Sequence, residues 1–260
     1  MSYFITYKNA KIHFTDEGTG EIILLLHGFL ENATMWDDLS YQLIKTHRVV
    51  CVDLLGHGKS ESLGYIHTME TMADALFSVL QHLKIKRVTI IGHSMGGYVS
   101  LALLEAHPNL VNALCLMNST AAEDSKEKKR NRDRAILAVK NNYETFVSLS
   151  IANLFSPKSK TLYKEAYKNV KLEALKTPVQ SIIASLEGMK IRKDRLELFK
   201  KSSLRKLVIL GKKDAILDCK LQRSYYENSD VKIVELPDGH MSHIENNTEF
   251  TYFIMRFIEK

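Results

Sequence analysis

The segment from Val88 to Glu105 constrains the fold more than any other part of this 260-residue chain. A short run of Val and Ile is followed by Gly92-His93-Ser94-Met95-Gly96 and then by an apolar helical stretch. This order predicts a buried strand that turns sharply into a helix, with Ser94 at the tip of the turn. A tip of this kind holds its residue in strained backbone geometry, so small residues are needed two positions before and after it. Ser94 is therefore a candidate nucleophile, although a tight structural turn around a buried serine gives the same short pattern.

Short apolar runs recur along the chain and alternate with stretches of helical periodicity. The runs are rich in Val, Ile and Leu and are bounded by polar residues or glycine, as expected for strands buried on both faces. The predicted strands span residues 3–8, 11–15, 21–27, 47–52, 87–91, 111–117, 204–210 and 231–236, and the predicted helices span 35–44, 69–83, 95–106 and 249–258. We therefore predict an α/β fold with a mostly parallel sheet of about eight strands and helices on both faces.

The pattern changes between residues 119 and 203, where helical periodicity continues without strand signals. Apolar residues such as Ile136, Val139 and Val147 are spaced for one buried helix face. Strand patterns resume after this segment. The sequence thus predicts one core domain, made of residues 1–118 and 204–260, with a helical cap of residues 119–203 inserted after the sixth strand.

The positive charge of the chain is concentrated in that insert. The whole chain has 36 Lys and Arg against 30 Asp and Glu, whereas residues 119–203 have 19 against 10. A run of charges on a helix is usually a solvated face, and binding of a substrate carboxylate is the alternative. Because the basicity belongs to one insert, we expect no nucleic-acid partner.

The number of cysteines, the length of the apolar runs and the first eight residues exclude several other classes of protein. Cys51, Cys115 and Cys219 are too few and too scattered for a disulfide framework or a zinc site. No apolar run approaches the roughly 18 residues that span a bilayer, and residues 1–8 lack the pattern of a secretory signal. We expect a cytoplasmic protein with no membrane partner, no metal and no organic cofactor, and either a monomer or a homodimer.

Two polar residues follow the last two predicted strands and supply partners for Ser94. A serine hydroxyl needs a base, and the base needs a third group that sets its tautomer. Asp214 follows the seventh strand and His240 follows the eighth, where parallel sheets gather their active sites. The order Ser94, Asp214, His240 is the one expected for this strand–turn–helix geometry. His243 is the rival base, Asp238 is the rival acid, and a plain turn residue is the alternative reading of Asp214.

Two backbone N–H groups are predicted to stabilise negative charge near Ser94. Met95 begins the helix after the turn, so its N–H is not used within that helix. The loop after the third strand begins His27-Gly28-Phe29, and Gly28 lets the backbone turn inward so that the N–H of Phe29 faces the same point. Phe29 and Met95 are therefore the candidate oxyanion donors.

Together these segments resemble the α/β-hydrolase superfamily, and the resemblance covers nearly the whole chain. It is carried by five stretches, at His27 to Phe29, Asp53 to Ser60, Gly92 to Gly97, Gly211 to Asp214, and Gly239 to His240. The resemblance implies a Ser-His-Asp triad, an oxyanion hole at Phe29 and Met95, and a helical cap. It also implies a serine hydrolase that cleaves small to medium carboxylic esters through an acyl-enzyme intermediate, with a small-molecule ester as its partner.

Other activities on the same triad stay open. Relatives that cleave carbon–carbon bonds share it, as do lyase-like enzymes of menaquinone synthesis, which look for an arginine on the helix after the nucleophile. This chain has Tyr98 one turn beyond Ser94, although Arg130, Arg132 or Arg134 of the cap could serve instead. A ligand receptor with slow or no turnover is the reading from a different class.

The substrate pocket is the part of the site on which the sequence says least. Aromatic residues of the core and the cap are candidates for it, and core packing explains any one of them equally well. The candidate substrate-binding residues are Trp36, Tyr98, Tyr143 and Phe146.

Overall fold

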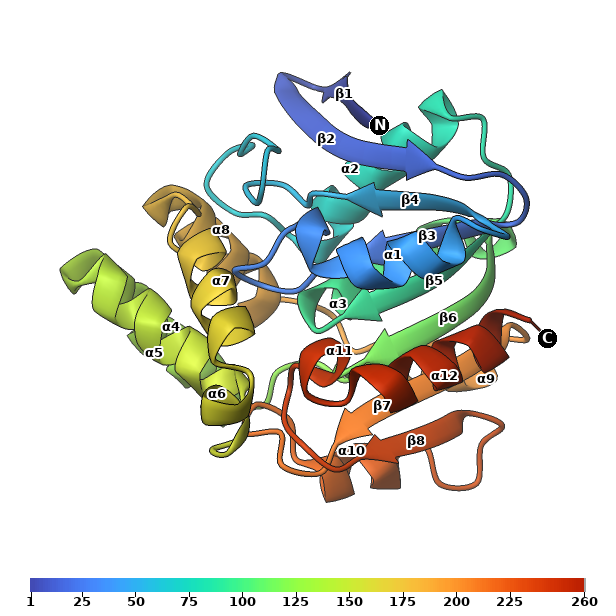
Figure 1. Ribbon diagram of the computed structural model, residues 1–260. Coiled ribbons are helices and arrows are strands. Elements are labelled where there is room, and N and C mark those ends of the chain that lie inside the picture. Colours follow the sequence, from blue (N-terminus) through green and yellow to red (C-terminus); the bar gives the residue numbers. More distant parts are fainter. Residues whose placement is uncertain (260) are drawn as a thin grey trace.

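One eight-stranded sheet organises the protein, and its strands run in the order β1-β2-β4-β3-β5-β6-β7-β8 (Figure 1). The structure is a computed structural model that describes residues 1–259. β1 and β2 are antiparallel, β2 pairs with β4 in the antiparallel sense, and all the other strands are parallel neighbours. The strands are β1 (Ser2–Tyr7), β2 (Ala10–Glu17), β3 (Ile22–Leu26), β4 (Arg48–Val52), β5 (Val88–His93), β6 (Val111–Met117), β7 (Arg205–Gly211) and β8 (Lys232–Leu236).

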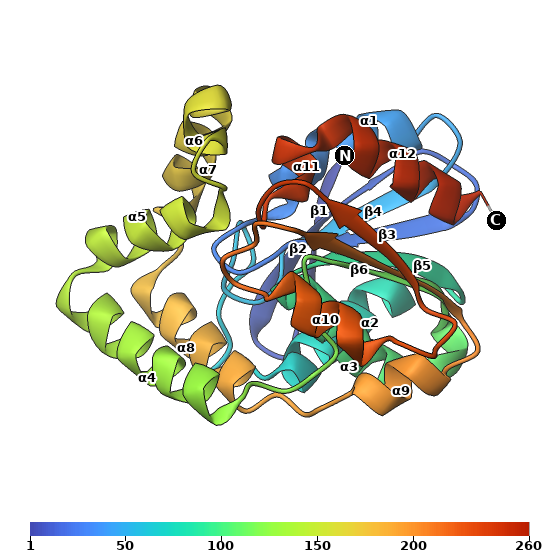
Figure 2. The ribbon, with the colours of Figure 1, turned by 90° about the horizontal axis from the view of Figure 1, so that it is seen from below.

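Alternating side chains of the central strands build two hydrophobic cores, one on each face of the sheet. On β3, Leu24 and Leu26 pack with α2 (Met69–His82) and α3 (Met95–Ala106), whereas Ile23 and Leu25 pack with α1 (Asp37–Leu43) and α12 (Asn247–Ile258). Figure 2 shows these two helix layers on opposite sides of the strands. The remaining core elements are η1 (Ala33–Trp36), η2 (Pro108–Leu110), α9 (Leu196–Lys201), α10 (Cys219–Tyr225) and α11 (Ser242–Glu245). The predicted α/β fold is confirmed.

A cap of five helices follows β6 and stands beyond the carboxyl ends of the parallel strands (Figures 1 and 2). Its helices are α4 (Lys126–Asn141), α5 (Tyr143–Leu154), α6 (Ser159–Leu162), α7 (Lys164–Ala174) and α8 (Val179–Lys190). Side chains cap the N-termini of the first two helices: the side chain of Ser125 accepts a hydrogen bond from Lys128 N, and that of Asn142 accepts one from Thr145 N. α9 lies inside the range predicted for the cap, but Phe199 of α9 packs against Tyr226, which follows α10 of the core, with the ring centroids 5.9 Å apart. The helices that stand away from the sheet therefore end at Lys190, before the predicted boundary at residue 203.

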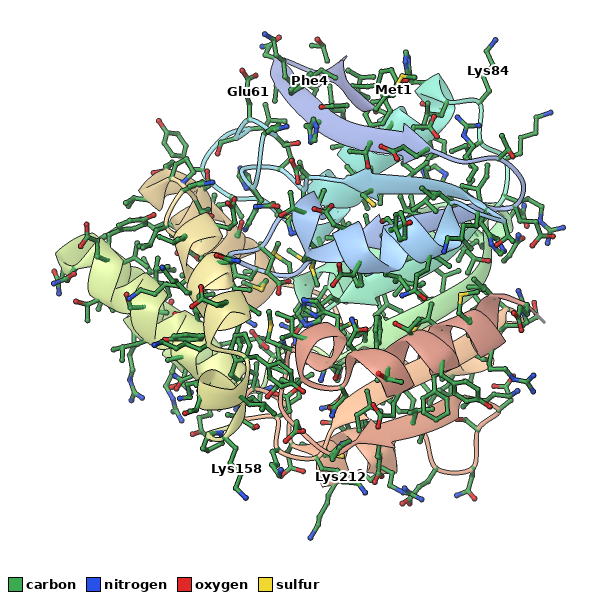
Figure 3. The ribbon with its side chains drawn as sticks, in the orientation of Figure 1. Met1, Phe4, Glu61, Lys84, Lys158 and Lys212 are labelled. Atoms are coloured by element: carbon green, nitrogen blue, oxygen red, sulfur yellow. The ribbon has the colours of Figure 1, made fainter. Side chains whose placement is uncertain are left out.

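Ion pairs and solvent take up much of the positive charge of the insert. Arg132 and Arg192 both bind the buried carboxylate of Asp124, with contacts of 2.5 and 2.6 Å. Arg195 binds Glu70 and Glu105 of the core, each at 2.7 Å. Lysines such as Lys158 extend outward from the cap (Figure 3). No helix in residues 1–259 has both the length and the apolar composition to cross a membrane.

The long loop between β4 and α2 joins the core to the cap. His67 N in this loop donates to the carbonyl of Ala184 in α8 at 2.9 Å. A Cβ atom on Gly188, one turn further along α8, would lie 1.7 Å from the carbonyl oxygen of His67. Only glycine therefore lets α8 approach this backbone so closely.

We expect Gly188→Ala to lower the free energy of unfolding by about 1–3 kcal/mol, the usual range for overpacking. The sign is informative, because Gly to Ala in an exposed helix would instead stabilise by about 1 kcal/mol. Urea denaturation measures the change. Gln180→Ala, at an exposed position of the same helix, is the matched control and should change little. A more stable Gly188→Ala protein would show that the cap does not pack on the core in this way.

The same loop buries two histidines, His57 and His67, which are both inaccessible to solvent. Burial lowers the pKa of His57 to about 3 and that of His67 to about 4. Both rings are therefore neutral in the folded protein, whereas in the unfolded chain they bind protons below about pH 6.5. The unfolded state then takes up more protons as the pH falls, so acid favours unfolding.

The free energy of unfolding should consequently fall between about pH 6.5 and pH 4, and these two histidines contribute at most about 2.7 kcal/mol per pH unit. Urea denaturation at about pH 7 and pH 5 measures the slope. His82→Gln, which alters an exposed histidine of α2, should leave it unchanged. Equal stability at the two pH values would contradict the burial of neutral rings.

Candidate active site

Ser94 occupies the sharp turn between β5 and α3, as the sequence predicts. Its φ of 47° and ψ of −113° place a residue other than glycine in the strained left-handed half of backbone space. A Cβ atom on Gly96 would lie 2.4 Å from the carbonyl oxygen of Leu26, so only glycine fits there. Neighbouring strands hold the turn: Ser94 N donates to Met117 O at 2.9 Å, and Ser119 Oγ donates to Ser94 O at 2.7 Å. The side chain of Ser94 is thereby presented beyond the carboxyl end of the sheet.

Asp214 and His240 meet in the turns that follow β7 and β8. His240 Nδ1 lies 2.6 Å from Asp214 Oδ2, and each side chain is only 2% exposed. Asp214 Oδ1 also accepts from the N–H groups of Ile216 and Leu217, at 2.8 and 3.0 Å. Burial alone would raise the pKa of Asp214, but His240 and these two amides outweigh it and hold the pKa below its ordinary value. Because an ionised carboxylate only accepts, Nδ1 carries the proton of the neutral ring, and Nε2 is left as the basic nitrogen.

The rival residues are engaged elsewhere. His243 lies in α11, where its ring faces those of Trp36 and His93 at centroid distances of 6.0 and 5.7 Å. Burial lowers the pKa of His243 to about 3, and its Nδ1 has no hydrogen-bond partner within residues 1–259. Asp238 pairs with Lys213 Nζ at 2.9 Å. Of these residues, His240 and Asp214 are therefore the histidine and the acid that pair with each other.

The N–H groups of Phe29 and Met95 are unpaired at the same edge of the sheet. Within residues 1–259 neither donates a hydrogen bond to the protein. Met95 is the first residue of α3, where helix geometry leaves the N–H free and the helix dipole is positive. Phe29 lies two residues before Glu31 in the loop after β3, and a Cβ atom on its neighbour Gly28 would lie 3.2 Å from Ser94 Cβ. Both amides are thus available for an oxyanion beside Ser94.

The four aromatic residues predicted to bind substrate have packing roles in the structure. Trp36 is fully buried in the core between α1 and α12. Its ring stacks on that of Phe250, with the ring centroids 6.5 Å apart. This corrects the sequence expectation for Trp36, because a side chain closed in that core has no surface for a substrate. Tyr143 donates through its hydroxyl to the carbonyls of Leu175 and Thr177 and so ties α5 to the end of α7.

Tyr98 and Phe146 also pack against neighbours. Phe146, in α5, is half-buried against the main core, and Tyr98, in α3, is almost fully buried. Arg192 lies over the Tyr98 ring, with its guanidinium carbon 4.1 Å from the ring centroid. This places an arginine beside the helix after Ser94, where it pairs with the carboxylate of Asp124. Arg132 pairs with the same carboxylate, so the three groups together keep one net positive charge. Arg130 and Arg134, the other two cap arginines of the sequence analysis, are exposed on α4.

Sequence reasoning missed three side chains that bind the loops of the site. Asn118 Nδ2 donates to Asp214 Oδ2 and to Gly239 O, at 3.2 Å each. Glu31 Oε2 accepts from Gly28 N at 2.6 Å and lies 2.7 Å from Nδ1 of His93. No local pattern signals these contacts, because the partners are 62 or more residues apart for His93–Glu31 and Asn118–Asp214.

Two cavities share a contact between cap and core, and none of Ser94, Asp214 and His240 lines either of them. Asn32 Nδ2, in the loop after β3, donates to Glu173 Oε2 of α7 at 3.2 Å. Both residues line both cavities, whose volumes are about 480 and 490 Å³. Leu30 and Met241, which follow Phe29 and His240 in the chain, line the second cavity. Residues 1–259 contain no cluster of three or more His, Cys, Asp or Glu side chains suited to a metal ion.

Comparison with known proteins agrees with this architecture. The sequence profile described as the alpha/beta hydrolase fold matches residues 21–247. A thermophilic esterase from Thermogutta terrifontis is 29% identical and superposes with a TM-score of 0.92 over 100% of this chain and 98% of that one. An enol-lactonase from Burkholderia xenovorans, at 21% identity, shares the fold with a TM-score of 0.91 over 99% of this chain and 100% of its own.

Curated sequences match over a shorter stretch. An uncharacterized protein of Mycobacterium tuberculosis is 35% identical over 116 residues, which are 45% of this chain and 34% of that protein. The match thus spans about a third of that relative's length. The family profile, by contrast, covers most of the chain from β3 to the start of α12. The chain therefore belongs to the alpha/beta hydrolase fold family.

Proposed function

We propose that this chain is a serine hydrolase that cleaves small to medium carboxylic esters through an acyl-enzyme intermediate. The observation that carries the proposal is the hydrogen-bonded pair of Asp214 and His240 at the sheet edge where strained Ser94 is presented. Similarity to hydrolases, including an esterase at 29% identity, supports hydrolytic chemistry.

The proposed cycle uses the same groups in both half-reactions. His240 Nε2 takes the proton of Ser94 as its oxygen attacks the ester carbonyl, and Asp214 stabilises the resulting imidazolium. The N–H groups of Phe29 and Met95 stabilise the tetrahedral oxyanion. His240 then gives that proton to the departing alcohol, which leaves the acyl group on Ser94. In the second half-reaction His240 takes a proton from water as the water oxygen attacks the acyl carbon, and it gives this proton to the departing Ser94 oxygen as the carboxylic acid is released.

The cavity lined by Leu30 and Met241 supports a substrate of modest size. Its volume of about 490 Å³ is within the range of small-molecule sites. The second cavity has several apolar walls close to the site, formed by Leu30, Met35 and Met241. An ester with a short or medium hydrocarbon chain matches this lining.

Ser94→Ala should lower turnover of a p-nitrophenyl ester about a millionfold, to near the background rate. The same change should abolish covalent labelling by a fluorophosphonate probe. Ser78→Ala, which alters a serine on the outer part of α2, is the control and should keep both properties. If the intact protein neither reacts with the probe nor turns over p-nitrophenyl esters of short and medium chain length, the reading as a ligand receptor replaces this proposal.

His240→Gln and His243→Gln together test the choice of base. We expect His240→Gln to lower kcat by at least about a thousandfold, because Ser94 then has no group to accept its proton. His243→Gln should retain most of kcat in the fraction of the protein that folds. Active-site titration with the fluorophosphonate measures that fraction. The reverse ranking would assign the base to His243.

A further inference from the structure

We propose that Glu31 and His93 form a buried ion pair that positions the oxyanion loop, the nucleophile turn and His240 relative to one another. This positioning role rests on the proposed function, but the ion pair itself does not. Both side chains are closed off from solvent, with exposed fractions of 3% and 1%. Neither is part of the proposed proton transfer, so the buried pair calls for another role.

The contacts of the pair reach all three segments that carry the site. Glu31 Oε2 accepts from Gly28 N at 2.6 Å, next to the oxyanion donor Phe29. The same oxygen lies 2.7 Å from Nδ1 of His93, the residue before Ser94. On its other side, His93 Nε2 lies 3.0 Å from the backbone oxygen of His240. A continuous chain of hydrogen bonds therefore runs from the oxyanion loop to the proposed base.

These partners determine the charge of His93. A carbonyl oxygen only accepts hydrogen bonds, so Nε2 must carry a proton. The carboxylate of Glu31 is held ionised: burial would raise its pKa, but His93 lowers it to about 2. Nδ1 must then carry a proton as well, and a ring with protons on both nitrogens is an imidazolium.

The surroundings of the His93 ring contain several other titratable groups. The rings of His240 and His243 lie at centroid distances of 5.0 and 5.7 Å from the His93 ring. Neither carries the negative charge that stabilises a protonated imidazole. Burial lowers the pKa of His27, and the nearby His93 lowers it further. The carboxylate of Asp214 makes a small contribution that raises the pKa of His93. Burial lowers the pKa of His93, but Glu31 leads the effects that together raise it above its ordinary value. Glu31 is therefore the group that keeps His93 charged.

A strained turn explains why the oxyanion loop needs such a brace. Leu30, between Phe29 and Glu31, has a φ of 65°, which is unfavourable for a leucine. The turn is closed by a long backbone hydrogen bond of 3.3 Å from Glu31 N to Gly28 O. The carboxylate of Glu31 holds Gly28 N much more closely. Loss of this anchor would let the N–H of Phe29 move away from the oxyanion.

Histidine nitrogen NMR on the intact protein tests the ion pair without any measurement of activity. We expect both nitrogens of His93, assigned through coupling to its backbone, to remain protonated at about pH 8. A His93 signal that loses a proton near pH 6.5, or that shows a single N–H at about pH 8, would overturn the proposal.

Glu31→Gln tests positioning, because glutamine keeps the size and an accepting oxygen but lacks the charge. His93 should then lose its second proton at a lower pH and give up one of its two contacts. Burial then leaves the His93 ring neutral, so its nitrogen NMR signal should show a single N–H at about pH 7. We expect kcat of this variant to be at least about tenfold lower than that of the intact protein, with a much smaller change in KM, since small displacements of reacting groups cost about that much.

Glu70→Gln provides the matched control, because it removes the ion pair that Glu70 makes with Arg195. Its kcat and its His93 NMR signal should match those of the intact protein. An unchanged kcat in Glu31→Gln, or a loss confined to KM, in a protein that does turn over esters would refute the positioning role. Absence of turnover in the intact protein would instead refute the proposed function, and the NMR measurement would still decide the ion pair.

Discussion

The strained turn at Ser94 is the constraint on which the rest of the site depends. A backbone with φ of 47° at a serine persists only where its surroundings hold it, and here they do so from three directions. Met117 and Ser119 bind it from β6 and the segment after β6, and Gly96 lies against the carbonyl of Leu26 in β3. The turn is therefore a product of the sheet: three parallel strands must be in register before the side chain of Ser94 points where chemistry can use it.

Buried charge organises the rest of this region. Asp214 beside His240, Glu31 beside His93, and Asp124 beside Arg132 and Arg192 each place an ionised carboxylate away from water. An unpaired buried charge is very unfavourable, so each pair holds its two segments at one separation. All of these contacts link loops at the carboxyl edge of the sheet or join that edge to the cap. These contacts therefore join the loops of this edge to one another and to the cap.

The contacts of the cap do not match the role that its positive charge suggests. Its surplus of lysine and arginine invites a search for an anionic substrate, yet Arg132 and Arg192 bind Asp124, and Arg195 binds core carboxylates. The cavities that lie between α7 and the core are instead lined in part by apolar and acidic residues such as Met35, Asp37 and Glu173. The charged side chains of the cap thus form ion pairs or face solvent. The walls of the cavities beneath the cap are instead partly apolar and partly acidic.

The sequence by itself determined the strands, the helices of the core, the insertion after β6, and the approach of Asp214 and His240. Apolar periodicity and glycine spacing are local, and the carboxyl ends of parallel strands must share one edge, so these features follow from residue order. Only the tertiary structure decided that Trp36 packs in the core, that Arg192 lies over Tyr98, and that Glu31 reaches His93. Such contacts join residues far apart in the chain, and their partners depend on how helices and loops pack rather than on any repeating pattern.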